Sequence, residues 1–163
     1  MNRRDVVAAT AVLGLTPVAL TPAFAAPGDK AVVEAMYARF FSAGGALDIA
    51  VEGERLMAPG FESVGDFSGK PKKRDELIKQ IQGFHKLVPD LKWEPQEIIE
   101  AGNRFVVRSR ASGTPKGPLF GVDGKGKAFT LMSIDIHEVV GGQIVRVYHV
   151  EDWAGAMRQL SAQ

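Results

Sequence analysis

The second half of the sequence reads as four β-rich segments whose breaks all contain glycine. The segments are rich in valine, isoleucine and aromatic residues and cover residues 91–100, 105–113, 127–139 and 143–151. They are separated by Gly102 with Asn103, by a loop at 113–126, and by the pair Gly141–Gly142. Because breaks of this kind join antiparallel neighbours, the pattern predicts a mainly antiparallel sheet of consecutive strands.

The first half of the sequence is mostly helical in pattern. Apolar residues recur at helical spacing in segments 30–42, 46–56 and 75–87. A short strand is expected at 61–67, and a last helix at 154–160. Helices followed by a run of antiparallel strands predict an α+β fold, in which the N-terminal helices pack on one face of a curved sheet.

Residues 1–25 have the layout of an export signal peptide. A basic start precedes an apolar stretch that is too short to span a membrane, and Ala23-Phe24-Ala25 places the expected cleavage after Ala25. The pair Arg3-Arg4 also fits a twin-arginine signal, so twin-arginine and general secretory export both remain open. We therefore expect one mature domain at 26–163, either periplasmic or secreted.

Charge and composition exclude several classes of function. The formal net charge is only +1, so no basic field is present to attract nucleic acid or, in the mature form, a membrane surface. The chain has no cysteine, which excludes disulfides, thiol nucleophiles and cysteine-ligated zinc. The 3 histidines lie on separate predicted elements, so no metal site is expected.

The alternation of side chains along the strands predicts which residues face the helices. In the third β-rich segment the apolar set is Met132, Ile134 and Ile136. In the fourth it is Val145 and Val147, followed on the same face by His149. We expect these two apolar sets to share the concave, helix-covered face. The alternate residues, which include Arg108, Arg110, Asp135, His137 and Arg146, are then expected on the outer face as charge pairs.

Several short motifs have the order and spacing of one known family. They are FHKLVPD at 84–90, EAGNRFVVR at 100–108, SGTPKGPLFG at 112–121, GK at 126–127, GQIV at 142–145 and RQL at 158–160. In this order they resemble the SnoaL-like polyketide cyclase (ester cyclase) family of the nuclear-transport-factor-2-like superfamily. The resemblance implies a cone, in which a strongly bent sheet wraps around a pocket and helices close one side. It also implies that a homodimer could form through the sheet.

The resemblance also implies a chemistry and places it on this sequence. Characterised cyclases of the family close a ring by an intramolecular aldol reaction without metal or cofactor. Their acid/base Asp lies three residues ahead of an Asp that opens the last helix, and a His on the preceding strand assists it. Here Asp152 matches the helix-opening Asp, His149 stands at the acid/base position, and the assisting His falls on Ile134. The pair is therefore not retained, which argues against polyketide cyclisation.

The remaining acid/base candidates lie around residue 149. His149 titrates near neutrality and suits proton transfer at the mouth of a pocket, or else it is a structural histidine satisfied by a neighbouring carbonyl or carboxylate. Glu151, on the same strand face, either orients the imidazole or points to solvent. Asp152 is predicted to cap the last helix, and Trp153 to pack against the sheet. His85, at a helix end, is predicted to be structural.

The apolar residues expected inside the cone indicate what kind of ligand it binds. Those expected to line the cone are Tyr37, Phe41, Phe84, Trp93, Met132, Ile134, Ile136 and Val147. Such a lining suits a small, largely apolar molecule with one carbonyl or hydroxyl group near His149. Two functions remain open: a cofactor-independent enzyme of cyclase, isomerase or lyase type, and a non-catalytic ligand-binding or dimerisation module of the same fold.

Overall fold

The computed structural model describes residues 29–42, 47–67 and 69–162. The predicted signal peptide, 1–25, lies outside these residues. The helices are α1 (Asp29–Ala35), the π-helix η1 (Met36–Phe41), α2 (Ile49–Leu56), α3 (Arg74–Leu87) and α4 (Trp153–Ser161). The strands are β1 (Met57–Val64), β2 (Lys72–Lys73), β3 (Lys92–Ala101), β4 (Arg104–Gly113), β5 (Phe129–Val140) and β6 (Gln143–Glu151). In this part of the chain, no helix is both long and apolar enough to cross a membrane.

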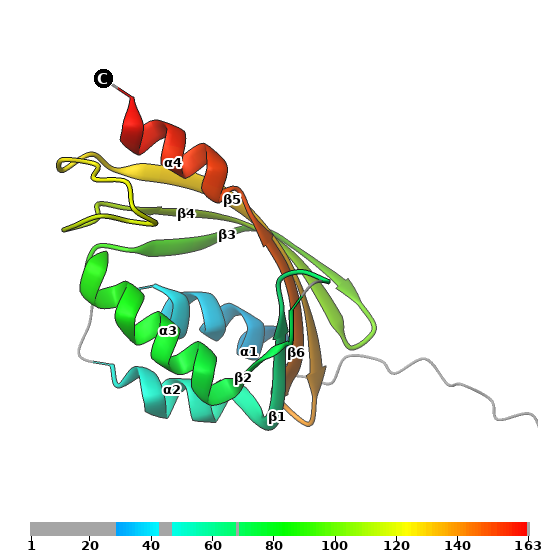
Figure 1. Cartoon of the computed structure of the whole chain (residues 1–163). Coiled ribbons are helices and arrows are strands. Elements are labelled where there is room, and N and C mark those ends of the chain that lie inside the picture. Colours follow the sequence, from blue (N-terminus) through cyan, green and yellow to red (C-terminus); the bar gives the residue numbers. More distant parts are fainter. Residues whose placement is uncertain (1–28, 43–46, 68, 163) are drawn as a thin grey trace, which may run out of the picture.

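The strands form one bent sheet in the order β2-β1-β6-β5-β4-β3. The predicted consecutive strands β3 to β6 pair antiparallel with their neighbours, whereas β1 pairs with β6 in parallel. Figure 1 shows the sheet curving around α1, α2 and α3, which lie inside the bend, while α4 lies beside β5. The α+β cone is therefore confirmed.

The helix predicted at 30–42 changes character halfway along. Its first part is the α-helix α1, and its second part is the π-helix η1. In η1 the side chains of Met36, Tyr37, Phe40 and Phe41 are all buried against the sheet. The wider turn of a π-helix is often found near functional sites, and here it places Tyr37 and Phe41 beneath the concave face.

The prediction of which side chains of β5 point into the cone is wrong. The ladder pairs Asp135 with His149 and His137 with Val147, so these four side chains share the concave face. The carboxyl group of Asp135 and the imidazole of His137 are both buried there: Asp135 is 3% exposed and His137 is 0% exposed.

Met132, Ile134 and Ile136 consequently lie on the outer face of the sheet. Met132 is 53% exposed and Ile134 45%. Ile136 pairs with Tyr148, which also faces outward. Because side chains alternate along a strand, burying Asp135 and His137 sends the three apolar neighbours outward, and they cannot line the cone.

Of the charged side chains predicted on the outer face, the three arginines are found there. Arg108 and Arg110 are exposed, and the Arg146 guanidinium donates to Glu62 at 2.6 Å. Glu62 also accepts from Lys73 at 2.7 Å. The cation of Lys73, then that of Arg146, holds the pKa of Glu62 below its usual range. Such exposed pairs join β1, β2 and β6 but contribute little to stability individually.

Candidate active site in the cone

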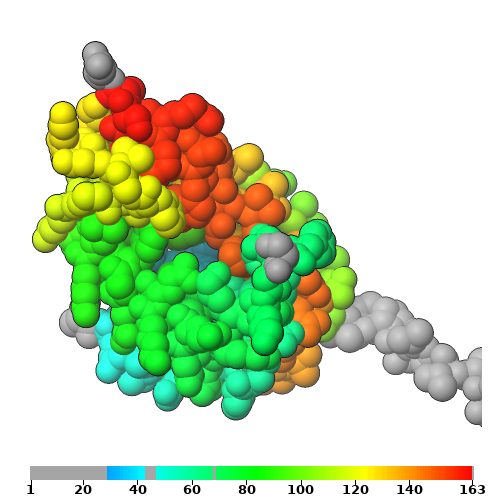
Figure 2. All heavy atoms as spheres, viewed as in Figure 1, coloured from blue at the N-terminus to red at the C-terminus, as the bar shows by residue number. Residues whose placement is uncertain are grey.

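A cavity of about 250 Å³ opens between α3, β1, β6 and the start of α4. Figure 2 shows the surface hollowed between the green atoms of α3 and the orange-red atoms of β6 and α4. Its walls combine aromatic and aliphatic side chains with a few polar groups. They are formed by Phe41, Ser63, Gly65, Asp66, Lys72, Leu77, Gln80, Ile81, Phe84, Trp93, Phe120, Asp135, Val147, His149, Glu151 and Trp153.

His149 is held in this cavity at both ring nitrogens. Its Nδ1 lies 2.8 Å from Glu151 Oε1, and its Nε2 lies 2.9 Å from Ser63 Oγ. A carboxylate accepts hydrogen bonds, so the neutral ring carries its proton on Nδ1 and donates it to Glu151. The Nε2 lone pair is then free to accept a proton, and Ser63 donates its hydroxyl to it. Glu151 therefore orients the imidazole, as one of the two sequence interpretations proposed.

The charges around His149 favour its protonated form. Burial lowers the pKa of His149, but the hydrogen bond and charge of Glu151, together with the charge of Asp135, raise it further than burial lowers it. The net result is a pKa above the ordinary value of histidine. The imidazole is thus a stronger base than a histidine in water.

Asp135 lies opposite His149 on the neighbouring strand and is embedded in hydrogen bonds. Its Oδ2 accepts from Tyr37 Oη at 2.8 Å and from Ser133 Oγ at 3.0 Å. Burial raises its pKa to about 6, although the two hydroxyl donors act in the opposite direction. A carboxyl group that titrates near neutrality inside a cavity is a candidate for proton transfer.

His137 extends the network behind Asp135. Its Nε2 lies 2.8 Å from Tyr37 Oη, and burial lowers its pKa to about 3, so the ring is neutral at physiological pH. Because the Tyr37 hydroxyl donates to Asp135, its oxygen accepts the Nε2 proton of His137. The Nδ1 atom is then a buried acceptor without a hydrogen-bond partner among the described residues. The predicted surface role of His137 is therefore wrong.

A second chain of hydrogen bonds supports Asp135 from the floor of the cavity. The indole Nε1 of Trp93 donates to Ser109 Oγ at 2.7 Å and to Ser133 Oγ at 3.1 Å. The two serine hydroxyls are 2.6 Å apart. Because Ser133 in turn donates to Asp135, the rigid indole fixes the hydroxyl that holds the carboxylate.

Aromatic rings form the mouth of the cavity. The Trp153 ring lies 5.4 Å from Phe84 and 5.2 Å from Phe120, centroid to centroid. Phe120 belongs to the loop between β4 and β5 and has a positive φ of 48°, which is uncommon for a bulky residue. Trp153 also contacts Phe129 of β5, so the prediction that it packs against the sheet is confirmed, although it lines the cavity as well.

The predicted site residues divide into three groups. Those that line the cavity are His149, Glu151, Phe41, Phe84, Trp93 and Val147. Tyr37 is completely buried behind the cavity, where it binds Asp135 rather than a ligand. Met132, Ile134 and Ile136 lie on the outer face, as described above.

Sequence reasoning missed Ser63 and Asp135. Ser63 shares a strand face with Phe61, whose aromatic side chain is completely buried, and this alternation was the available signal. Asp135 was assigned to the wrong face. The position counted for the assisting His was Ile134, one residue away from the side chain that actually faces His149.

The prediction that His85 is structural is confirmed by its hydrogen bond. His85 Nε2 donates to the Phe41 carbonyl at 3.0 Å, so His85 ties α3 to η1 rather than capping its own helix. No cluster of three or more His, Asp or Glu side chains suited to a metal ion occurs within 29–42, 47–67 and 69–162.

Asp152 caps α4, as predicted. Its Oδ1 accepts from the Gly155 backbone N–H at 2.8 Å. We expect Asp152→Ala to lower the free energy of unfolding by about 1 kcal/mol, because this N–H loses its partner. Asp152→Asn should keep most of the stability, since the amide oxygen still accepts. Urea unfolding measures both, and equal losses in the two variants would contradict a capping role.

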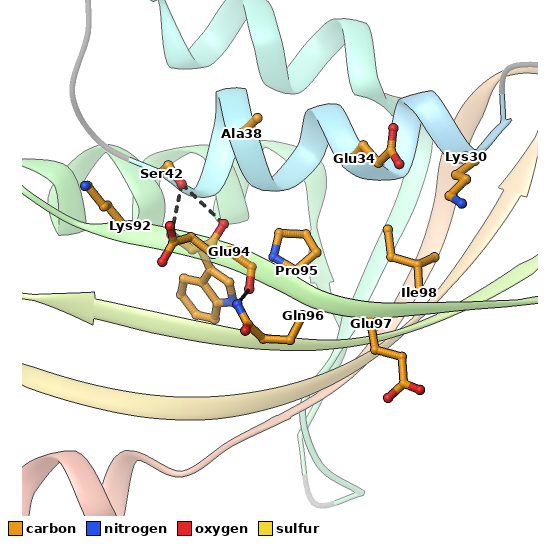
Figure 3. A pocket seen from close by; sticks show the side chains of 11 residues that line it. Lys30, Glu34, Ala38, Ser42, Lys92, Glu94, Pro95, Gln96, Glu97 and Ile98 are labelled. Carbon is orange, nitrogen blue, oxygen red and sulfur yellow. Dashed lines mark hydrogen bonds between the residues drawn. The ribbon is translucent and has the colours of Figure 1, made fainter.

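A second depression, of about 630 Å³, is wider and more open. It lies between α1, η1 and β3 and is lined by Lys30, Glu34, Ala38, Ser42, Lys92, Trp93, Glu94, Pro95, Gln96, Glu97 and Ile98. Figure 3 shows its charged side chains spread along the helix and the strand, without convergence on a common point. The cone cavity, with its converging His and carboxylates, is therefore the better site for chemistry.

Comparison with known proteins identifies the fold. The sequence profile of the SnoaL-like polyketide cyclase family matches residues 31–160. Among proteins of curated function, none matches the sequence.

Two solved structures illustrate the similarity in shape. A candidate SnoaL-like polyketide cyclase from Jannaschia sp. CCS1 is 21% identical, with a TM-score of 0.71, over 84% of this chain and 94% of that one. IdmH, a candidate polyketide cyclase from Streptomyces antibioticus, is 22% identical, with a TM-score of 0.70, over 82% of this chain and 99% of that one.

A third structure has a similar shape. A protein of ketosteroid isomerase-like fold from Catenulispora acidiphila, solved with trimethylamine, is 14% identical, with a TM-score of 0.64, over 81% of this chain and 93% of that one. At these identities, all three similarities establish the fold.

Proposed function

Because this chain belongs to the SnoaL-like polyketide cyclase family, we propose that it binds a small, largely apolar carbonyl compound and moves a proton on it through His149. The chemistry is of the isomerase, aldol or cyclase type and uses the side chains of the cone cavity without a cofactor. One observation carries the proposal. An imidazole whose Nε2 lone pair accepts the Ser63 hydroxyl lies in a largely apolar cavity, oriented by Glu151 and facing the buried carboxyl of Asp135.

The family pattern supports this assignment in an altered form. Characterised cyclases of the family have an Asp at the position of His149 and an assisting His on the preceding strand. In this chain the imidazole is on β6, and the carboxyl group, Asp135, is on β5. An acid/base pair on the same two strands, with its members exchanged, can serve the same proton transfers.

The proposed reaction begins with removal of a proton from a carbon next to the substrate carbonyl. His149 Nε2 accepts this proton, and the Glu151 carboxylate stabilises the imidazolium that forms. Asp135, whose pKa lies near neutrality, donates a proton to the developing enolate oxygen when it is protonated. Return of the proton at another carbon gives isomerisation, and attack of the enolate on a second carbonyl in the same molecule closes a ring.

The alternative is a module that binds without turnover. The same cavity would then hold its ligand through Phe84, Trp153 and the other apolar walls. The exposed outer side chains Met132, Ile134 and Val150 favour a homodimer through the sheet. Either role fits an exported, periplasmic or secreted protein, which is the localisation that the leader sequence predicts.

Solvent isotope exchange tests the proposal directly. The protein is incubated in deuterated buffer with a panel of small apolar ketones, and deuterium uptake next to the carbonyl is measured by mass spectrometry. We expect uptake above the uncatalysed rate for at least one class of ketone. Binding of ketones without any exchange would favour the non-catalytic module and contradict the proposal. A copurified ligand, identified by mass spectrometry, would narrow the panel.

The pH dependence of the exchange rate reports the state of His149. His149 accepts a proton only when neutral and Asp135 donates one only when protonated, so the rate follows a bell-shaped pH profile. Its acid limb breaks near 6, the pKa of Asp135, and the midpoint of its basic limb lies at the higher pKa of His149, above about 6.5. In Glu151→Gln the charge that raises this pKa is removed, so the midpoint moves to lower pH and the maximal rate falls. A rate profile of kcat/KM against pH measures both, and an unchanged midpoint would contradict the role of Glu151.

A further inference from the structure

We propose that Ser63, His149 and Glu151 form a nucleophilic triad that cleaves small apolar esters or lactones. The proposal rests on the proposed function in that it uses the same cavity and the same imidazole. It adds a nucleophile, a covalent intermediate and a substrate class. The three side chains stand in the order that such chemistry requires: a hydroxyl, a base that can take its proton, and a carboxylate that orients the base.

The distances agree with this order. Ser63 Oγ is 2.9 Å from His149 Nε2, and His149 Nδ1 is 2.8 Å from Glu151 Oε1. Both lie within the range expected for a nucleophile–base bond and for a base–orienter bond. Glu151 and His149 come from β6 and Ser63 from β1, and the pairing of Ser63 with Val147 in the parallel ladder fixes their spacing.

Gly65 lets the imidazole lie close to the backbone of the chain after β1. A Cβ atom built on Gly65 would lie 3.1 Å from His149 Cε1 and 3.3 Å from its Nε2. The imidazole therefore packs directly on the backbone two residues beyond Ser63. A side chain at this position would push the ring away from the hydroxyl.

Lys72 supplies a cation beside the hydroxyl. In the β1–β2 pair, Lys72 stands opposite Ser63, and both residues line the cavity. The positive charge of Lys72 lowers the pKa of His149, although the carboxylates outweigh it, so the ammonium lies within electrostatic range of the ring. A cation in this place can stabilise the negative oxygen that forms when a hydroxyl attacks an acyl carbon.

The reaction balances with water as the second substrate. As Ser63 Oγ bonds to the acyl carbon, its proton passes to His149 Nε2. The carbon–oxygen bond of the ester then breaks, and the leaving alkoxide takes that proton. Water attacks the acyl-serine and gives a proton to Nε2, and this proton returns to Ser63 Oγ as the acid departs. The apolar walls and the volume of about 250 Å³ restrict the acyl group to a small, uncharged one.

Covalent labelling tests the triad without knowledge of the natural substrate. The whole protein is treated with a dialkyl fluorophosphate, which phosphorylates an activated serine with loss of fluoride. We expect one adduct, which peptide mass mapping places on Ser63. Ser63→Ala should give none, and His149→Ala should label more slowly by on the order of 100-fold or more. Ser161→Ala is the matched control, since this hydroxyl donates to the Met157 carbonyl in α4, and it should label like the wild type.

Release of nitrophenolate from a nitrophenyl ester of a short fatty acid gives the second measurement, and circular dichroism confirms that each variant is folded. No adduct on wild-type Ser63, or equal labelling of His149→Ala, would overturn the triad. Deuterium exchange into ketones without labelling would refute the triad alone. Labelling without exchange would refute the proposed proton transfer and leave the triad standing.

Discussion

His149→Ala is expected to lower the rate of proton exchange into a carbonyl substrate by on the order of 100-fold or more. The variant removes the only imidazole that lines the cone cavity as the structure describes it, and with it the Nε2 lone pair. Glu151 then loses its hydrogen-bond partner. Steady-state rates at the pH optimum of the wild type measure the loss.

A second histidine provides the control. His85 lies outside the cavity and donates to the Phe41 carbonyl, so His85→Gln, which can still donate, should retain turnover. Ligand affinity separates loss of chemistry from loss of binding: KM should change little in His149→Ala if the apolar walls supply most of the binding. Equal rates in His149→Ala and wild type would end the catalytic role of this residue.

Tyr37→Ala is expected to lower the free energy of unfolding by about 3–5 kcal/mol. Tyr37 is completely buried in η1, and its ring packs edge-on against Phe41 and His137. The deletion leaves a void beneath the sheet. It also leaves the buried Asp135 carboxyl without one of its donors and His137 Nε2 without its partner. Chemical denaturation at neutral pH measures the loss.

Tyr37→Phe isolates the contribution of the hydroxyl. The ring remains, so the expected loss is smaller, about 1–3 kcal/mol, because Asp135 loses one of its two donors and His137 Nε2 loses its partner. Because the Tyr37 hydroxyl holds down the pKa of Asp135, the variant should also raise that pKa further above its ordinary value. Infrared titration of the carboxyl group reads this shift. A loss in Tyr37→Phe as large as in Tyr37→Ala would assign the whole effect to the hydroxyl and contradict the cavity argument.

The parts of the fold that follow from local sequence were predictable. The four strands β3 to β6 were expected within about two residues of their ends, because glycine breaks separate runs of β-branched and aromatic residues. The cap on α4 was also predictable, since Asp is preferred at that position and Asp152 directly precedes the helical run. The orientation of His149 into the cone followed from simple alternation along β6.

Which face of β5 is buried in the cone could not be predicted from the hydrophobicity of its side chains. Both faces of this strand carry apolar side chains, and the face with Met132, Ile134 and Ile136 is the more apolar one. The molecule nevertheless buries the face with Asp135 and His137, because Tyr37 supplies a buried hydroxyl that pairs with both. A partner 98 residues away in the sequence thus decides the orientation, and no local pattern reveals it.

The parallel pairing of β1 with β6 could not be predicted from the sequence for a similar reason. A strand at 61–67 was expected, but parallel partners are not joined by a short turn, so nothing near Ser63 indicates that β6 lies beside it. Without that partner, neither the contact of Ser63 with His149 nor the approach of Gly65 to the ring could be anticipated.

The same parallel pairing has a consequence for the order of folding. Ser63 precedes His149 by 86 residues, so closing this contact requires a long loop of chain to be brought together. Contacts of such high sequence separation slow folding and tend to form after local helices and hairpins. The antiparallel strands β3 to β5 can pair during synthesis, but β1 must wait until β6, which follows them in the chain, has left the ribosome. The candidate active site is therefore completed late in folding, and it exists only in a chain whose strands β1 and β6 have already paired.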